Sequence, residues 1–257
     1  MLYRPLFWTA FWCEDWLRAS AYRGASCVLI SSASAKTAFC LAYLINKRAG
    51  TCGAGKIEVI GLTSGRNLDF TRDLGLYDHV IEYDAIEQSN IFPSVNRTWL
   101  YVDVTGNDDL NTRIQRLFRK HSSNTLAGCI QLGLTNLSPT NPLASTIKFS
   151  TNTGVKTSSQ TGANNPIALE QFFMPEWLAV RRRQLTVSQI TTMQVAAWRN
   201  LLQDGSKWVN IVRVNGPTAV EMAYYEVAGR GLDPKTGMIW SLWEDDTGFD
   251  RGISPKL

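Results

Sequence analysis

A short polar segment at residues 31–37, SSASAKT, carries the side chains best suited to hold an anion. It lies between a continuous apolar run at 26–30 and an apolar, helix-forming stretch at 38–47. A turn from a buried strand into a helix directs backbone N–H groups and the positive end of the helix dipole at a phosphate. The hydroxyl donors and the cation of the segment are Ser31, Ser32, Ser34, Thr37 and Lys36. The segment therefore predicts a diphosphate-binding turn.

Alanine stands in this turn where glycine is usual. The residues concerned are Ala33, Ala35 and Ala38. Alanine costs roughly 1–2 kcal/mol wherever the backbone must be left-handed. Either the turn keeps ordinary backbone angles at these positions, or the phosphate lies slightly further out. In a second interpretation, the small residues only allow the helix to pack closely on the strand.

A nucleotide-triphosphate loop is an alternative for the same residues. Lys36 and Thr37 end the segment as they would end such a loop, and Asp103 closes a later hydrophobic strand. The loop requires glycine at positions where this sequence has Ile30 and Ala35. The dinucleotide interpretation is therefore favoured.

The loop after the second apolar run indicates which dinucleotide is bound. NAD enzymes hold an acidic residue here against the ribose hydroxyls, whereas NADP enzymes place a cation or small polar groups for the 2′-phosphate. Residues 61–67, GLTSGRN, contain no acid, and the first one after them is Asp69. Ser64 and Arg66 would suit a phosphate, which a guanidinium can hold bidentately. The sequence thus predicts NADP(H), unless Arg66 is only an exposed loop residue.

The elements that must position these residues alternate along the chain. Apolar runs predict strands at 26–30, 56–62, 79–83, 98–104 and 126–134. Helical patterns predict helices at 5–22, 38–47, 67–74 and 108–121. Strands that alternate with helices favour a parallel sheet with right-handed crossovers. The predicted fold class is α/β: a Rossmann-type, doubly wound, mainly parallel sheet with helices on both faces.

The remainder is predicted to complete a single domain over residues 1–257. Residues 135–166 are rich in Ser, Thr, Asn and Gly around one short strand at 146–150. They predict a long loop that is either disordered or a lid over a site. The C-terminal part, 167–257, is expected to hold two helical stretches within 175–202, a strand at 208–214, a helix at 217–229 and a last strand at 238–243.

Composition limits the classes of function. Of the 257 residues, 44% are hydrophobic and 19% charged, which excludes disorder as the main state. A net charge of +4 argues against nucleic-acid binding but permits an anionic ligand. Five scattered cysteines and two histidines argue against a metal site. No apolar run reaches the roughly 18 residues of a spanning helix, so we expect a cytoplasmic protein without a membrane span.

Four segments in order carry a resemblance to a known superfamily. They are CVLISSASAKT (27–37), IGLTSGRN (60–67), LGLYDHVIEYD (74–84) and YVDVTGN (101–107). Together they resemble the cofactor domain of the medium-chain dehydrogenases/reductases, in the quinone-oxidoreductase-like branch. Within that branch they are similar to a fungal family of unknown function with a Ser-Ser-Ala-Ser-Ser-Lys-Thr-like turn. The likeness spans residues 1–134 and returns at 219–243.

The resemblance implies roles for particular residues. Residues 32–37, among them Ala33, would line the pyrophosphate, and Ser64 and Arg66 the adenosine phosphate. The nicotinamide end would lie near Thr105, Gly106, Asn107, Leu132, Gly133 and Leu134. The superfamily also has an N-terminal β-rich, GroES-like domain that supplies much of the substrate pocket. This sequence starts at the helix before the cofactor domain, so another wall is expected: the loop at 135–166, the segment 172–177 or a second subunit.

Two residues are the best candidates for catalysis. Asp103 ends the fourth predicted strand, where such folds place ligand contacts, and could act as a general base or orient a ribose. Tyr101 is a candidate proton donor, as are Tyr83, Tyr224 and Tyr225. The alternatives are a plain strand-end residue for Asp103 and packed or surface aromatics for the tyrosines.

These observations lead to an NADP(H)-dependent oxidoreductase that acts on a small apolar carbonyl, enone or quinone-like substrate. An alternative is a reductase-derived, non-redox enzyme of secondary metabolism, such as an isomerase, cyclase or dehydratase. A non-catalytic partner that uses the fold for assembly is the third hypothesis, since fold alone does not determine function. Because a chain without its partner domain exposes an apolar face, we expect a homodimer.

Overall fold

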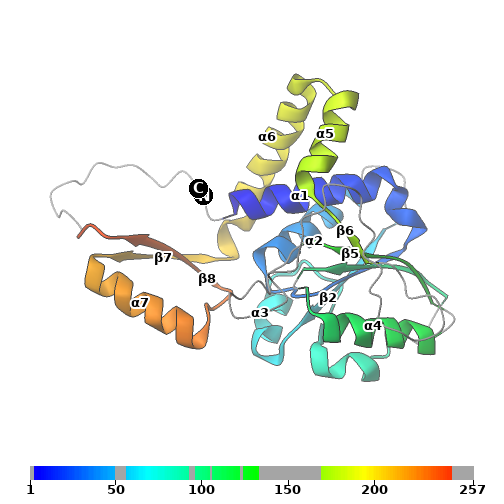
Figure 1. Cartoon of the computed structure of the whole chain (residues 1–257), viewed down its shortest axis with the longest axis horizontal. Helices are drawn as coiled ribbons and strands as arrows, with labels where there is room; N and C mark the ends of the chain where they lie inside the picture. The colour runs from blue at the N-terminus through cyan, green and yellow to red at the C-terminus, as the bar shows by residue number, and fades with distance from the viewer. Residues whose placement is uncertain are drawn as a thin grey trace, which may run out of the picture. The chain divides into compact units, whose positions relative to one another are not determined.

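The structure, a computed structural model, describes residues 3–49, 56–92, 96–104, 106–121, 124–132 and 169–244 (Figure 1). The chain divides into two compact units. The first is Tyr3–Arg181, and the second contains Arg182–Leu257. The predicted loop at 135–166 and its short strand at 146–150 lie outside the described residues.

The first unit is built on a six-stranded sheet. Its strands are β1 (Cys27–Ile30), β2 (Glu58–Thr63), β3 (His79–Glu82), β4 (Thr98–Asp103), β5 (Thr125–Gln131) and β6 (Leu169–Gln171). Their order is β3-β2-β1-β4-β5-β6, and every neighbouring pair is parallel. This is the Rossmann order, in which the direction of winding reverses between β1 and β4. The predicted fold class is confirmed.

The central strands are apolar because helices cover both faces of the sheet. All four residues of β1 are buried, as are the last five of both β2 and β4. A strand that is buried on both faces gives a continuous apolar run rather than an alternating one. This is why the runs at 26–30, 56–62 and 98–104 could be recognised in the sequence.

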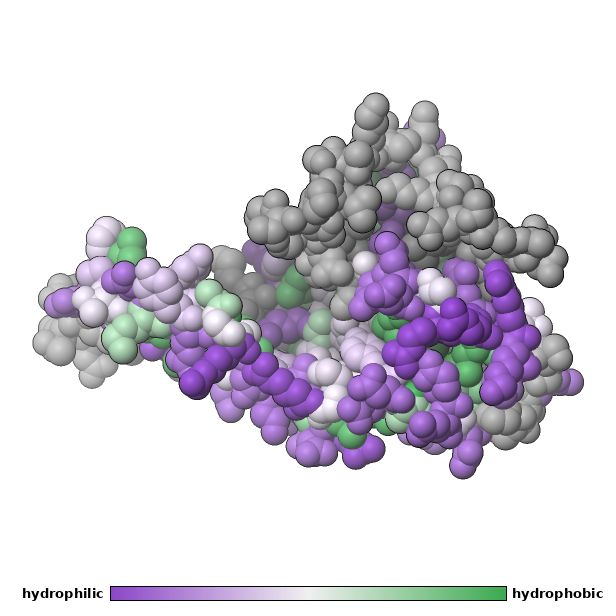
Figure 2. All heavy atoms as spheres, turned by 60° about the horizontal axis from the view of Figure 1, so that its bottom comes forward, coloured by the Kyte–Doolittle hydropathy of each residue, from purple (hydrophilic) through white to green (hydrophobic). Residues whose placement is uncertain are grey.

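Helices complete the first unit. They are α1 (Arg4–Ala19), α2 (Lys36–Ala49), α3 (Leu68–Asp73), α4 (Asp108–Lys120) and most of α5 (Met174–Gln184), with 3-10 turns η1 (Ala21–Gly24), η2 (Gly65–Asn67) and η3 (Tyr83–Gln88). Helix α4 packs its apolar side chains, such as Ile114 and Leu117, into one core cluster with Leu29 and Tyr101 of the sheet. Figure 1 shows α1 and α2 on the opposite side of the sheet. For α2, which links β1 to β2, this is the side that a right-handed crossover requires. Seen from the side of α4, the first unit presents a largely hydrophilic surface (Figure 2).

The link between α1 and β1 is a left-handed turn. Ala21, Tyr22 and Arg23 have φ values of 48°, 49° and 54°, and Gly24 follows at 75°. Such angles cost a non-glycine residue roughly 1–2 kcal/mol. Side-chain contacts hold the turn: the Tyr22 hydroxyl donates to Glu14 Oε1 at 2.8 Å, and Arg23 Nη2 lies 2.5 Å from Glu170 Oε2 of β6. The strain is therefore offset by contacts to α1 and to the edge of the sheet.

The second unit contains α6 (Val187–Asp204), η5 (Gly205–Lys207), β7 (Asn210–Asn215), α7 (Pro217–Arg230) and β8 (Thr236–Ser241). β7 and β8 form a parallel pair in a sheet of their own, joined by α7. The side chains of Tyr224 and Trp240 meet between α7 and β8, with ring centroids 6.4 Å apart. The helices and strands predicted for this region are present. That they complete a single domain over residues 1–257 stays a prediction. No helix in the described part of the chain is long and apolar enough to cross a membrane.

The left-handed turn predicts opposite effects of the same substitution at two exposed alanines. Ala21→Gly relieves the strained φ and should raise the free energy of unfolding by about 1 kcal/mol. Ala179→Gly, in the middle of α5, should lower it by about 1 kcal/mol because glycine weakens a helix interior. Urea unfolding of the two variants measures both changes. A destabilised Ala21→Gly protein would contradict the left-handed turn.

Candidate functional site

The turn from β1 into α2 keeps ordinary backbone angles at its alanines. Among the non-glycine residues that the structure describes, positive φ values occur only at Ala21, Tyr22, Arg23 and Ser32. Ser32, with φ 50°, is thus the left-handed residue of the turn. This answers the question raised by the missing glycines: Ala33 and Ala35 need no left-handed conformation.

Ala33 packs the turn against β2. Its backbone N–H donates to the Leu62 carbonyl at 2.8 Å, and its own carbonyl accepts from the Tyr77 hydroxyl at 2.8 Å. A Cβ atom on Gly61 would lie 2.8 Å from Ala33 Cβ, so only glycine at position 61 allows this approach. Ala33 is completely buried, and its predicted place in the pyrophosphate site stays a prediction.

The buried carboxylate of Asp103 joins three segments at the carboxyl edge of the sheet. Oδ1 accepts hydrogen bonds from Ser31 Oγ and from the Gly106 backbone N–H, both at 3.0 Å. Oδ2 accepts from Asn111 Nδ2 of α4 at 2.8 Å. Asp103 therefore ties the end of β1, the loop after β4 and α4 to one another.

Further hydrogen bonds extend this network. Ser31 Oγ accepts from the Val104 N–H at 2.9 Å, and the Tyr101 hydroxyl donates to Asn111 Oδ1 at 2.8 Å. The Leu132 N–H donates to the Asp103 carbonyl at 2.8 Å. Burial raises the pKa of Tyr101 well above its ordinary value, which keeps the phenol neutral. The geometry gives Asp103 and Tyr101 a positioning task, and their catalytic roles stay predictions.

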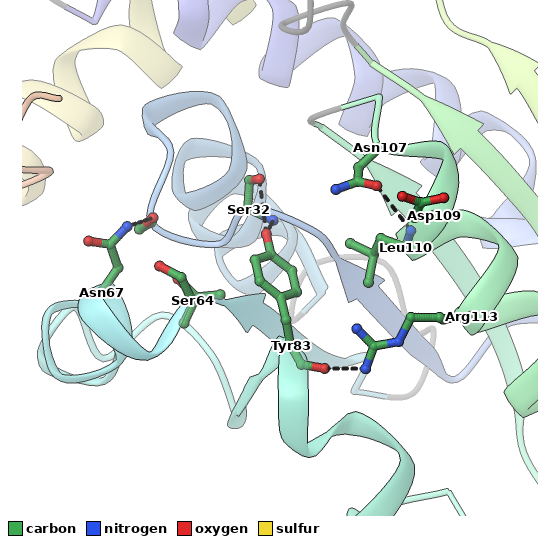
Figure 3. A pocket seen from close by; sticks show the side chains of 10 residues that line it. Ser32, Ser64, Asn67, Tyr83, Asn107, Asp109, Leu110 and Arg113 are labelled. Carbon is green, nitrogen blue, oxygen red and sulfur yellow. Dashed lines mark hydrogen bonds between the residues drawn. The ribbon is translucent and has the colours of Figure 1, made fainter. Parts of the chain in front are cut away.

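A cavity of about 330 Å³ opens beside this network (Figure 3). Its lining combines the β1–α2 turn, the ends of β2 and β3, and the first turns of α4. The lining residues are Ser32, Ser34, Thr63, Ser64, Asn67, Tyr83, Asn107, Asp109, Leu110 and Arg113. The cavity lies where the order of the strands reverses, which is where open α/β sheets bind their ligands.

The α4 side of the cavity is held rigidly. Asn107 caps the helix, because its Oδ1 accepts from the Leu110 N–H at 3.0 Å. The Arg113 guanidinium binds both oxygens of the Glu87 carboxylate at 2.8 Å and donates to the Tyr83 carbonyl at 2.8 Å. The guanidinium thereby fixes the backbone of η3 against α4 (Figure 3).

The Tyr83 hydroxyl reaches from η3 to the β1–α2 turn. Its oxygen accepts from the Ser32 backbone N–H at 2.9 Å and lies 3.1 Å from Ser32 Oγ. Burial, with a smaller contribution from the Asp103 charge, raises the pKa of Tyr83. The hydroxyl therefore keeps its proton at neutral pH.

The structure brings together only part of the predicted site. Ser32, Ser34, Ser64 and Asn107 line the cavity, whereas Ser31 and Gly106 belong to the Asp103 network. Lys36 and Thr37 begin α2, Arg66 is exposed on η2, and Leu132 is half-buried after β5; none of these four is in the lining. Thr105, Gly133 and Leu134 lie outside the described residues.

Several lining residues were not recognised in the sequence. They are Thr63, Asn67, Asp109, Leu110 and Arg113. Thr63 ends β2, and the two acidic residues at 108–109 open α4, so the rule that strand ends face the ligand could have indicated both regions. Within the described ranges, no group of three or more His, Cys, Asp or Glu residues could hold a metal ion.

Comparisons with known proteins give a family and similar solved structures. A family model described as protein of unknown function (DUF2855) matches residues 1–233. The chain is similar to the crystal structure of the yhdH oxidoreductase from Salmonella enterica in complex with NADP, with 13% sequence identity and a TM-score of 0.48. The match covers 91% of this chain, which spans 60% of the length of that one. No curated protein matches the sequence.

The hydrogen bonds of Asp103 predict that its replacement destabilises the protein more than the replacement of a surface carboxylate does. Asp103→Asn places an N–H₂ group against donors of Ser31, Gly106 or Asn111, and should lower the free energy of unfolding by about 2 kcal/mol. Asp109→Asn removes an exposed charge at the cavity rim and should change it by less than about 0.5 kcal/mol. Urea unfolding distinguishes the two. Equal stabilities would remove the bracing role of Asp103.

Proposed function

The chain belongs to the family described as protein of unknown function (DUF2855), and we propose that it binds NADP(H) in the cavity beside the β1–α2 turn and acts as an oxidoreductase. The observation that carries this proposal is the position of the cavity, at the strand-order reversal of a Rossmann sheet. Its volume of about 330 Å³ is within the range of small-molecule sites.

The charges around the cavity favour one orientation of the ligand. Ser32 and Ser34 present hydroxyl groups next to the N-terminus of α2, where the helix dipole favours an anion. Asp109, on the α4 side, would repel a phosphate. The pyrophosphate is therefore expected against the turn, with Lys36 as its cation, and the adenosine between β2 and α4.

The end of β2 supports a preference for the phosphorylated cofactor. Ser64 and Asn67 line the cavity there, and Arg66 lies between them in sequence on the exposed turn η2. The Glu82 carboxylate approaches the same turn, since a Cβ on Gly65 would lie 2.2 Å from its Oε1. A carboxylate can also hold ribose hydroxyls, so an NAD-binding site is the second candidate at this position.

The substrate in this proposal is a small apolar carbonyl, enone or quinone-like molecule. NADP(H), when bound, supplies or accepts the hydride, and the chain binds and orients both reactants. Asp103 would then hold the loop after β4 in place rather than react. The rival proposal is a non-redox isomerase, cyclase or dehydratase derived from a reductase. A homodimer and a cytoplasmic location remain part of the proposal.

Titration with NADPH, followed by its fluorescence, tests cofactor binding. The unsubstituted protein should bind NADPH more tightly than NADH, because only NADPH offers a 2′-phosphate to Ser64 and Arg66. Lys36→Ala should weaken NADPH binding at least several-fold. Lys120→Ala, which removes the same charge at the far end of α4, is the matched control and should leave the dissociation constant unchanged.

Each alternative result is informative. Equal affinity for NADPH and NADH would remove the 2′-phosphate proposal in favour of the ribose-binding alternative. An unchanged dissociation constant in Lys36→Ala would remove the diphosphate role of the turn. Substrate turnover without an absorbance change of the nicotinamide would favour the non-redox enzyme.

A further inference from the structure

The Tyr83 hydroxyl accepts a hydrogen bond from the backbone N–H group of Ser32, which a phosphate bound at this turn would also need. Ser32 is the left-handed residue of the β1–α2 turn, and its backbone N–H donates to Tyr83 Oη at 2.9 Å. Backbone N–H groups around a left-handed residue form concave sites for anions. Tyr83 belongs to a different element, η3, and lies 51 residues after Ser32 in the sequence.

We propose that Tyr83 is a displaceable occupant of the phosphate subsite, and that it sets the affinity of the cavity for phosphorylated nucleotides. The inference rests on the proposed function. A ligand phosphate replaces the phenol oxygen as the acceptor for Ser32 N–H, and the Tyr83 side chain turns away from the turn. A phosphate oxygen is the stronger acceptor, because hydrogen bonds to charged groups are about twice as strong as neutral ones.

The backbone of Tyr83 is fixed, while its half-buried ring packs against the core cluster and lines the cavity. Its carbonyl is fixed by Arg113 at 2.8 Å, and Arg113 is itself held by Glu87. In Figure 3 the Tyr83 ring stands between Ser64 and Leu110, inside the space that the adenosine would fill. Rotation of the side chain would therefore release the phosphate donor and the nucleoside space together.

Tyr77 provides a natural comparison at the same turn. Its hydroxyl donates to the Ala33 carbonyl at 2.8 Å, and the residue is not in the cavity lining. A hydroxyl bound to a carbonyl acceptor does not compete with a phosphate for a donor. Removal of the two hydroxyl groups should consequently have different effects on ligand binding.

Calorimetric titration of the full-length protein tests the inference with three probes: NADP⁺, inorganic pyrophosphate and adenosine. Tyr83→Phe should bind NADP⁺ and pyrophosphate about three- to tenfold more tightly than the unsubstituted protein, the range that one neutral hydrogen bond spans. Adenosine should gain by a similar factor, because its entry also requires the Tyr83 ring to leave the nucleoside space and so breaks the same hydrogen bond. Tyr77→Phe should show no gain for any probe.

The outcomes separate this inference from the proposed function. If the unsubstituted protein binds NADP⁺ and Tyr83→Phe binds it equally or more weakly, the inference is overturned while cofactor binding stands. If neither protein binds NADP⁺, both proposals fail. Binding by Tyr83→Phe alone supports both.

A measurement on the unsubstituted protein makes the test independent of the variant's folding. Nuclear Overhauser contacts between the Ser32 amide proton and the Tyr83 ring should be present without ligand. They should disappear when NADP⁺ saturates the protein. Contacts that persist at saturation would overturn the inference.

Discussion

The arrangement of the carboxyl edge depends on one buried carboxylate. Asp103 ends β4 without exposure to solvent, and its oxygens accept from the residue that follows β1, from the loop behind β4 and from α4. A buried charge is tolerated only where donors satisfy it, so these three segments must keep their relative positions. The cavity beside them is lined by two of these segments, so its shape depends on their positions.

The same constraint explains how a turn without glycine can line the cavity. Ser31 is drawn inward to Asp103, Ala33 packs against β2 beside Gly61, and Ser32 between them takes the left-handed angle. Ser31 and Ala33 thus point into the interior, whereas Ser32 and Ser34 line the cavity. The Ser32 N–H is directed outward, where the hydroxyl of Tyr83 meets it.

Local patterns in the sequence were enough for the first five strands of the sheet and for part of the site. The apolar run before Ser31 and the small polar residues after it predicted β1, its turn and α2. The loop after β2 singled out Ser64, which lines the cavity. Strand β6, Leu169–Gln171, is too short to show a periodicity. Other contacts of the site join residues that are far apart in sequence. Asp103 accepts from Ser31, the Tyr83 hydroxyl accepts from Ser32, and Arg113 donates to the Tyr83 carbonyl. No local pattern predicts such contacts, so the sequence suggested a general base, a ribose-orienting residue or a plain strand-end residue at Asp103, but not its bonds to Ser31 and Asn111.

A crystal structure of the protein with NADP⁺ would test the central claim most directly. The account predicts the pyrophosphate against the turn at Ser32 and Lys36, the adenosine between Ser64 and Leu110, and an intact set of hydrogen bonds around Asp103. A cavity that stays empty at saturating NADP⁺, or a dinucleotide bound elsewhere on the chain, would contradict it.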